Sequence, residues 1–97
     1  MVRVVLLKFH SDQVKDALDK LNSIAPKVRA QRGCKFLEIS QGFHDKSEII
    51  TYSYWESQND LNVYRQSDFF RAFWKDIRVN FQEPARAWSV ESCVRLN

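Results

Sequence analysis

The segment Val2–Phe9 is apolar on both of its alternating faces, and this pattern limits where it can lie in a fold. Successive side chains of a strand point to opposite sides of a sheet. One side of this segment carries Val2, Val4 and Leu6, and the other carries Val5, Leu7 and Phe9. A strand that is apolar on both sides must be covered on both sides, so we expect it in the middle of a sheet.

The next segment changes to the three-to-four-residue spacing of a helix that lies on a sheet. Apolar residues recur at this spacing from Val14 to Val28. Ser11 or Asp12 is expected to cap the start of the helix, because each can accept hydrogen bonds from its free N–H groups. Pro26 is expected to kink or briefly break it, and Gly33 to end it in a left-handed conformation.

The remainder of the chain alternates between strand and helix signals. Two strands, Cys34–Gln41 and Glu48–Trp55, are predicted to form a hairpin with the connection Gly42–Ser47. A short helix Asn59–Arg65 follows, and then an aromatic helix that is capped at Ser67-Asp68 and extends to Phe81. The last predicted element is a strand, Ala85–Val94, which follows Pro84.

This order predicts an α+β fold of the ferredoxin-like βαββαβ type, with a four-stranded antiparallel sheet and helices on one face. At 97 residues the chain is long enough for one hydrophobic core, so residues 1–97 are expected to form a single domain. The helices leave the second face of the sheet uncovered, although the first strand is apolar there too. The same sheet from a second copy is the simplest cover, and we therefore expect a homodimer, the dimeric α+β barrel.

Composition narrows the function classes. Seven Phe, three Tyr and three Trp are a heavy aromatic load for so short a chain, and large flat side chains suit cores, interfaces and pockets. The net charge of +3 is spread along the sequence without a basic run, which predicts neither a nucleic-acid nor a membrane partner. The third strand also lacks the basic residue and glycine of an RNA-recognition motif.

The two cysteines, Cys34 and Cys93, have no metal or redox spacing, and the N-terminal apolar run is too short for a signal peptide. A reduced, cytoplasmic protein is therefore expected, with both thiols unpaired. The sequence contains no carboxylate pair, metal-ligand cluster, nucleophile triad or glycine-rich phosphate loop.

Three segments carry a resemblance to a known family. They are the run Tyr54–Leu61 (YWESQNDL), the run Tyr64–Phe70 (YRQSDFF) and the Arg32-Gly33-Cys34 sequence before the second strand. Together with the element order, they resemble the antibiotic biosynthesis monooxygenase family. The resemblance implies a dimeric α+β barrel with a pocket between the sheet and the helices that follow the third strand. It also implies oxidation of phenols or quinols by molecular oxygen without a cofactor, while one branch of the family degrades haem.

The resemblance also suggests where catalytic residues would lie. Quinol-oxidising members often carry His-x-x-Ser at the start of the second helical region, where this chain has Tyr64-Arg65-Gln66-Ser67. Tyrosine has a pKa near 10 and is a poor base at neutral pH, but it can orient a substrate hydroxyl. His10, at the end of the first strand, is the remaining candidate for a proton acceptor. Haem degradation is disfavoured because Trp74 stands where that branch has its iron-ligating histidine, and indole nitrogen only donates hydrogen bonds.

Tyr64 and His10 are therefore the catalytic candidates. The candidate substrate-binding residues are Tyr54, Phe70, Trp74, Arg86 and Trp88. Each has a structural alternative. The aromatic helix that contains Phe70 and Trp74 is typical of core packing, Tyr54 fits a pocket or a dimer interface, and Arg86 and Trp88 fit a stacked pair or an anion site.

Two functions follow from these patterns. One is a cofactor-independent monooxygenase that oxidises a quinol or phenolic aromatic, in which the protein supplies a dry aromatic cavity, a proton acceptor and donors for the anion. The other is a non-catalytic dimeric module that binds a small aromatic or hydrophobic ligand in the same cavity. The absence of the family's histidine favours the second function, and the known activities of the family favour the first.

Overall fold

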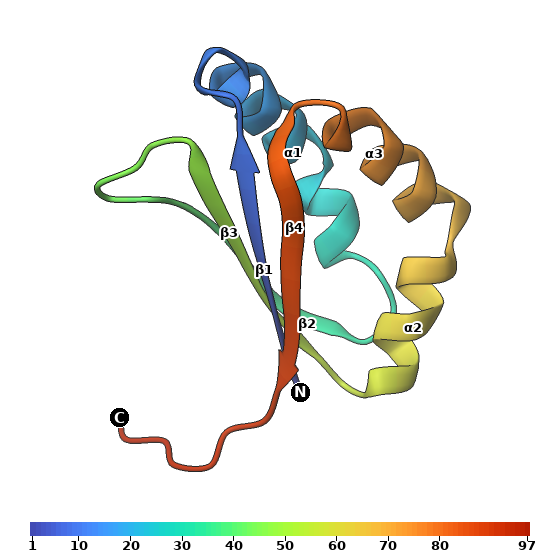
Figure 1. The fold of residues 1–97 in the computed structure, drawn as a ribbon. Coiled ribbons are helices and arrows are strands. Elements are labelled where there is room, and N and C mark those ends of the chain that lie inside the picture. Colours follow the sequence, from blue (N-terminus) through green and yellow to red (C-terminus); the bar gives the residue numbers. More distant parts are fainter.

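The structure is a computed structural model that describes all of residues 1–97, and it consists of one antiparallel sheet with helices on one side (Figure 1). The elements, in chain order, are β1 (Val2–Phe9), the short 3-10 helix η1 (Ser11–Gln13), α1 (Val14–Arg29), β2 (Cys34–Gln41), β3 (Glu48–Trp55), α2 (Gln58–Gln66), α3 (Asp68–Arg78) and β4 (Phe81–Val90). The strand order is β2-β3-β1-β4. The predicted ferredoxin-like fold is confirmed, and β1 lies inside the sheet as its two apolar faces require.

The strand register divides the sheet into an inner face under the helices and an outer face. On the inner face Leu7 pairs with Ile49, and both are buried against α1 and α3. A second buried cluster, around Trp55 and Leu61, joins β3 to α2. The hydrophobic core therefore lies between the inner face and the three helices.

The outer face has no cover in the single chain. Val4 on β1 lies between Tyr52 of β3 and Trp88 of β4, so these side chains share that face. Large apolar side chains remain accessible on it: Phe36 is 41 %, Ile50 38 %, Trp88 45 % and Val90 43 % exposed. Monomeric proteins rarely expose a contiguous apolar surface of this kind.

A serine residue caps the start of each of the helices α2 and α3. Ser57 accepts a hydrogen bond from the backbone N–H of Asp60 at the start of α2. The Ser67 hydroxyl accepts from the N–H of Phe70 at 3.1 Å and donates to the carbonyl of Tyr64 at 2.6 Å. Ser67 thus satisfies free backbone groups at the end of α2 and the start of α3, which confirms the predicted cap.

The start and middle of α1 differ from prediction. Neither Ser11 nor Asp12 caps α1 with its side chain. The chain instead enters α1 through η1, where the N–H of Gln13 bonds to the carbonyl of His10. The predicted break at Pro26 is also absent, because a proline removes only one backbone hydrogen bond and the apolar stripe of the helix stays buried on both sides of it.

Gly33 has a left-handed conformation with φ of 84°, as predicted, but it lies beyond the C-terminal cap of α1 at Ala30. It turns the chain into β2, and a Cβ atom at this position would collide with the side chain of Asp60.

The last strand also differs from prediction. Phe81 and Pro84 belong to β4 and not to the preceding helix and connection, and β4 ends at Val90 instead of Val94. Register shifts against β1 leave Pro84 and Ala85 opposite Leu7. A proline is tolerated here because β4 is an edge strand and the shift forms a bulge.

None of the helices is both long enough and apolar enough to span a membrane.

We predict that Ser67→Ala lowers the free energy of unfolding by about 1 kcal/mol, because the first turn of α3 loses its side-chain acceptor. Urea denaturation followed by tryptophan fluorescence measures this loss. Ser23→Ala is the matched control, because Ser23 is exposed within α1 and forms no cap. Equal stabilities of the two variants would show that the cap contributes nothing.

Candidate functional site

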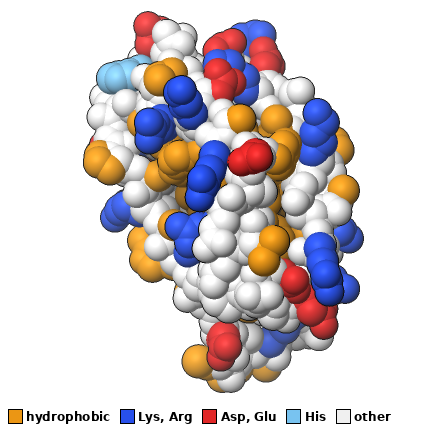
Figure 2. Space-filling model, turned by 90° about the vertical axis from the view of Figure 1, so that its right-hand side faces the viewer, with side chains coloured by type: hydrophobic (Ala, Val, Ile, Leu, Met, Phe, Trp, Pro, Cys, Tyr) orange, Lys and Arg blue, Asp and Glu red, His pale blue; other side chains and the backbone are white.

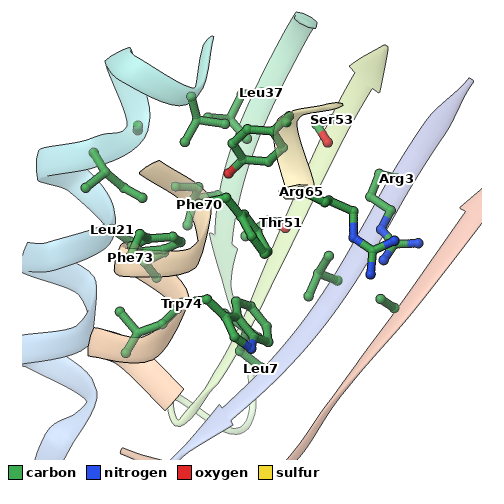
Figure 3. Close-up of a pocket in the computed structure, with 18 of the residues that line it drawn as sticks. Arg3, Leu7, Leu21, Leu37, Thr51, Ser53, Arg65, Phe70, Phe73 and Trp74 are labelled. Atoms are coloured by element: carbon green, nitrogen blue, oxygen red, sulfur yellow. The ribbon is translucent and has the colours of Figure 1, made fainter. Parts of the chain in front are cut away.

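A cavity of about 310 Å³ lies between the inner face of the sheet and the three helices (Figure 3). It is lined by 21 residues, and the only ones that are not hydrophobic are Arg3, Thr51, Ser53 and Arg65. An apolar protein cavity of about 150 Å³ can hold a benzene molecule. This cavity therefore has room for a ligand of about two fused rings, at the lower end of the usual range for ligand pockets.

Small side chains on the sheet and large ones on the helices explain why the cavity stays open. The sheet contributes short side chains, among them Thr51, Ser53, Ala85 and Ala87. The helices contribute Tyr64, Phe70, Phe73 and Trp74, and Figure 3 shows the rings of Phe70 and Trp74 extending from α3 toward the sheet. Rigid aromatic rings cannot collapse onto a floor of small residues, so space remains between the two layers.

The aromatic residues form a continuous column along the helical side. The ring of Tyr64 stacks on Trp55 at a centroid distance of 5.1 Å and meets the edge of Phe70 at 5.1 Å. Phe70 stacks on Trp74 at 5.6 Å, and Trp74 meets Phe81 at 5.4 Å. Offset-stacked and edge-to-face contacts of this kind are favourable beyond simple burial. They hold the cavity wall in one arrangement.

Tyr64 is the only ionisable residue buried in this wall. It is 9 % exposed, and burial raises the pKa of its phenol well above the usual value of 10. No hydrogen bond of the structure involves its hydroxyl, which remains available to a ligand. At neutral pH Tyr64 is therefore a hydrogen-bonding group and not a base.

Two hydroxyls lie on the floor of the cavity. The Ser53 oxygen accepts a hydrogen bond from the indole nitrogen of Trp55 at 3.0 Å. Its own hydrogen can still be donated to a ligand. Thr51 adds a second hydroxyl two residues away on the same face of β3 (Figure 3). The floor thus offers neutral polar contacts among apolar surfaces.

Arg3 of β1 and Arg65 of α2 supply the only full charges along the cavity. Arg3 is half-buried and Arg65 is exposed, so the pair lies at the rim, where Figure 3 shows the two guanidinium groups extending toward each other. Ala87 of β4 also lines the cavity and is exposed, so the cavity reaches the surface beside β4.

The surface on the side of α2 and α3 is rich in basic groups. Figure 2 views the molecule from this side and shows Lys and Arg side chains, interspersed with Asp and Glu, around patches of hydrophobic side chains. Exposed Arg65, Arg71, Lys75 and Arg78 all belong to these two helices.

Three of the seven predicted site residues lie together. Tyr64, Phe70 and Trp74 line the cavity.

The other four predicted residues do not line the cavity. Tyr54, Arg86 and Trp88 lie on the outer face of the sheet, on the side opposite to the helices. The guanidinium of Arg86 lies 5.7 Å from the ring centre of Trp88, which is the stacked arrangement predicted as one of their two options. His10 is exposed at the end of β1 and is also outside the cavity.

Sequence reasoning missed Arg3 and Arg65. The sequence did contain an indication for Arg3, because a charged residue is rarely buried and an arginine within a strand that is otherwise apolar on both faces points to a specific role. Arg65 follows Tyr64 directly and had no comparable signal. Its approach to Arg3 depends on how α2 packs over β1.

No carboxylate, imidazole, amine or thiol lines the cavity. In the whole chain no cluster of three or more His, Cys, Asp or Glu side chains has the geometry to hold a metal ion. The cavity can therefore exclude water, hold an aromatic ligand between rings, donate hydrogen bonds and attract negative charge. A proton acceptor is not among its own side chains.

Comparison with known proteins agrees with this architecture. The sequence profile of the family described as antibiotic biosynthesis monooxygenase matches residues 1–76. The chain belongs to this family. The matched segment includes β1 and all of the helices except the end of α3, and hence Arg3, Tyr64, Phe70 and Trp74. No curated protein matches the chain.

Several solved structures share the fold of this family member. A protein from Nitrosomonas europaea, provisionally named an antibiotic biosynthesis monooxygenase, superposes with a TM-score of 0.88 at 12 % identity, covering 95 % of this chain and 88 % of its own. One from Bordetella bronchiseptica with the same provisional name gives a TM-score of 0.85 at 17 % identity, with 96 % of both chains covered. A conserved protein from Methanosarcina mazei gives 0.82 at 15 % identity, with 89 % of this chain and 86 % of its own covered. At these identities the likeness concerns the fold alone.

We predict that the raised pKa of Tyr64 makes the protein less stable in alkali. The unfolded chain loses the tyrosine proton near pH 10, whereas folded Tyr64 keeps it, so stability is full below pH 10 and falls as the pH rises further. The free energy of unfolding should fall between pH 10 and 12 by about 1 kcal/mol per pH unit more in the wild type than in Tyr64→Phe. Urea titrations at a series of pH values measure this difference.

Between pH 7 and 9 the two proteins should show the same pH dependence, which serves as the internal control. Parallel curves up to pH 12 would contradict the burial of an un-ionised Tyr64.

Proposed function

We propose that the protein is a cofactor-independent monooxygenase that oxidises a quinol or phenolic aromatic with molecular oxygen. The observation that carries the proposal is the cavity itself, which is walled by aromatic rings, has hydroxyls on its floor and has two guanidinium groups at its rim. Membership of the antibiotic biosynthesis monooxygenase family supports the reaction class.

The chemistry requires little from the protein beyond positioning and electrostatics. An ionised phenol can transfer an electron to oxygen, and the two radicals can combine to form a hydroperoxide at a ring carbon. Loss of water then leaves a quinone, so that phenol and O2 give quinone and water. One oxygen atom enters the product, the other leaves as water, and the substrate supplies all four electrons. The cavity would hold the ring, exclude water and stabilise the anion.

Tyr64 would orient the substrate in this scheme. Its hydroxyl is un-ionised, lies in the cavity wall and has no partner within the protein. It can therefore donate a hydrogen bond to a substrate oxygen while its ring packs against Trp55 and Phe70. Phe70 and Trp74 would contact the apolar body of the substrate.

The alternative is a non-catalytic dimeric module that binds a small hydrophobic ligand. One observation favours it: none of the side chains that line the cavity is a base at neutral pH. His10, which directly follows β1, is exposed outside the cavity. The alternative uses the same cavity and differs only in the absence of turnover.

In either case we propose that two copies pair through the outer faces of their sheets. This face carries large exposed apolar side chains, and Phe36, Tyr52 and Tyr54 form a cluster of rings on it with centroid separations of 5.6 to 6.2 Å. Burial of this surface against a second copy would stabilise a chain whose own core is small.

Oxygen consumption tests the proposed reaction. We expect the purified protein to consume oxygen with at least one member of a panel of hydroquinones and polycyclic phenols, at a rate that saturates with substrate and needs no added metal or cofactor. Tyr64→Phe should lower kcat/KM by about tenfold, since one neutral hydrogen bond to the substrate contributes about 0.5–1.5 kcal/mol. Tyr52→Phe removes the same hydroxyl on the outer face and should leave the rate unchanged.

No uptake above autoxidation, with phenols that demonstrably bind, would favour the binding module. An unchanged rate in Tyr64→Phe would remove Tyr64 from the site.

The dimer is tested separately by sedimentation. We expect the wild type to sediment at twice the mass of the 11.5 kDa chain and Trp88→Glu to sediment as a monomer, because a charge buried between two sheets is unfavourable. Val63→Glu is the control, since Val63 is 59 % exposed on α2, on the helical side of the sheet. A monomeric wild type at high concentration would refute pairing through the sheet.

A further inference from the structure

Arg3 and Arg65 have no ionic partner in the protein. All ion pairs of the structure are formed by lysines, namely Lys8, Lys15, Lys20 and Lys35. Arg3 donates one hydrogen bond, to the neutral hydroxyl of Ser89 at 3.1 Å. A guanidinium has five N–H donors, so most of the donors of this pair are free to bind a ligand.

The two cations also face each other at an apolar cavity. Burial and the charge of Arg65 both lower the pKa of Arg3, which shows that the second guanidinium is near enough to repel the first. Like charges held together in a partly desolvated site are unfavourable, and an anion between them would remove this repulsion.

No other charge near the cavity offsets the pair. The lining residues from α1, β2, β3, α3 and β4 include no ionisable side chain, and besides Arg65 itself α2 adds only the neutral phenol of Tyr64. The field at the rim is therefore positive at all physiological pH values. Guanidinium groups bind carboxylates and other oxyanions through paired hydrogen bonds.

We infer that Arg3 and Arg65 form a binding site for the oxyanion of an aromatic ligand whose ring system occupies the cavity. The oxyanion is either a phenolate, formed when the bound phenol loses its proton to water, or a carboxylate that the ligand carries. In the phenolate case Arg3 and Arg65 compensate for the lack of a proton acceptor in the cavity, since they favour the ionised substrate without accepting the proton. This inference deepens the proposed function and rests on the same cavity.

The expected change in the pKa of a bound phenol depends on two opposing influences, the nearby positive charges and the apolar walls. A positive charge within about 4–6 Å lowers the pKa of an acidic group by about 1–3 units, whereas an apolar cavity raises it. Two guanidinium groups at a partly exposed rim should outweigh the apolar walls. We therefore expect the pKa of a bound phenol to fall by at least about one unit.

Absorbance titration of 7-hydroxycoumarin, a two-ring phenol whose spectrum reports its ionisation, tests this directly. The titration is done without oxygen and with protein in excess. The pKa of the bound phenol should lie at least about one unit below that of the free phenol, and Arg65→Gln should remove most of the shift. Arg71→Gln, an exposed arginine on α3 that does not line the cavity, is the matched control and should keep the shift.

A second arm identifies a carboxylate ligand. 2-Naphthoate should displace the coumarin at least about tenfold better than 2-naphthamide, and Arg65→Gln should abolish this preference. Arg3→Lys keeps one charge on β1 and should give an intermediate result, which guards against an Arg3→Gln variant that fails to fold.

The outcomes are separable. A lowered phenol pKa supports the phenolate, and a preference for naphthoate alone supports the carboxylate. If wild type binds these compounds with neither effect, or binds none of them, the inference is overturned. Because the titration is done without oxygen, a positive result would support the arginine site even if the protein proved inactive as an enzyme. Conversely, oxygen uptake that does not depend on Arg3 and Arg65 would support the monooxygenase proposal and refute the arginine site.

Discussion

The packing of large rings on α2 and α3 over short side chains on the sheet is the constraint on which the rest of the molecule depends. Tyr64, Phe70 and Trp74 are held apart from the floor because their rings contact one another along the helical layer. Ala85 and Ala87 are too short to reach them. A core of larger strand residues would close this space and stabilise the chain, and only 15 of the 97 residues are buried. The interior is thus packed less densely than it could be, and the cavity lowers the stability of the fold.

The same sheet has a second constraint, because its central strand is apolar on both faces. The inner face is covered by the helices of its own chain, while the outer face presents Phe36, Tyr52 and Trp88 to solvent. A domain of this size buries a modest share of its surface when folded alone. The proposed pairing with a second copy would cover the exposed aromatic face and add burial to the small core. The cavity and the proposed interface lie on opposite sides of one sheet, so a substitution in a strand can affect both.

The first three strands could be predicted from the sequence to the residue, because the alternation of side chains along a strand can be read directly from the local sequence, whereas the bounds predicted for β4 were four residues too late at both ends. Alternation also grouped Arg86 with Trp88 correctly on one face. It could not tell which face the helices would cover, and for that reason Tyr54, Arg86 and Trp88 were placed in a pocket that lies on the other side of the sheet. The end of α3 was misplaced for a related reason, since Phe81 continues the helical spacing but is fixed by its pairing with Phe9 in the sheet. Arg65 approaches Arg3 only through tertiary packing, which no local pattern contains.

The irregular edge of β4 limits how copies of the protein can associate through their sheets. An unpaired strand edge offers free N–H and C=O groups to which a strand of another molecule can add, which is a route to fibres. Pro84 lacks an N–H group, and the bulge at Pro84–Ala85 bends the strand out of the regular ladder. Both features blunt this edge against strand addition. An aromatic-rich protein with an exposed sheet can therefore associate face to face in a closed pair while it resists growth from its side into open-ended polymers.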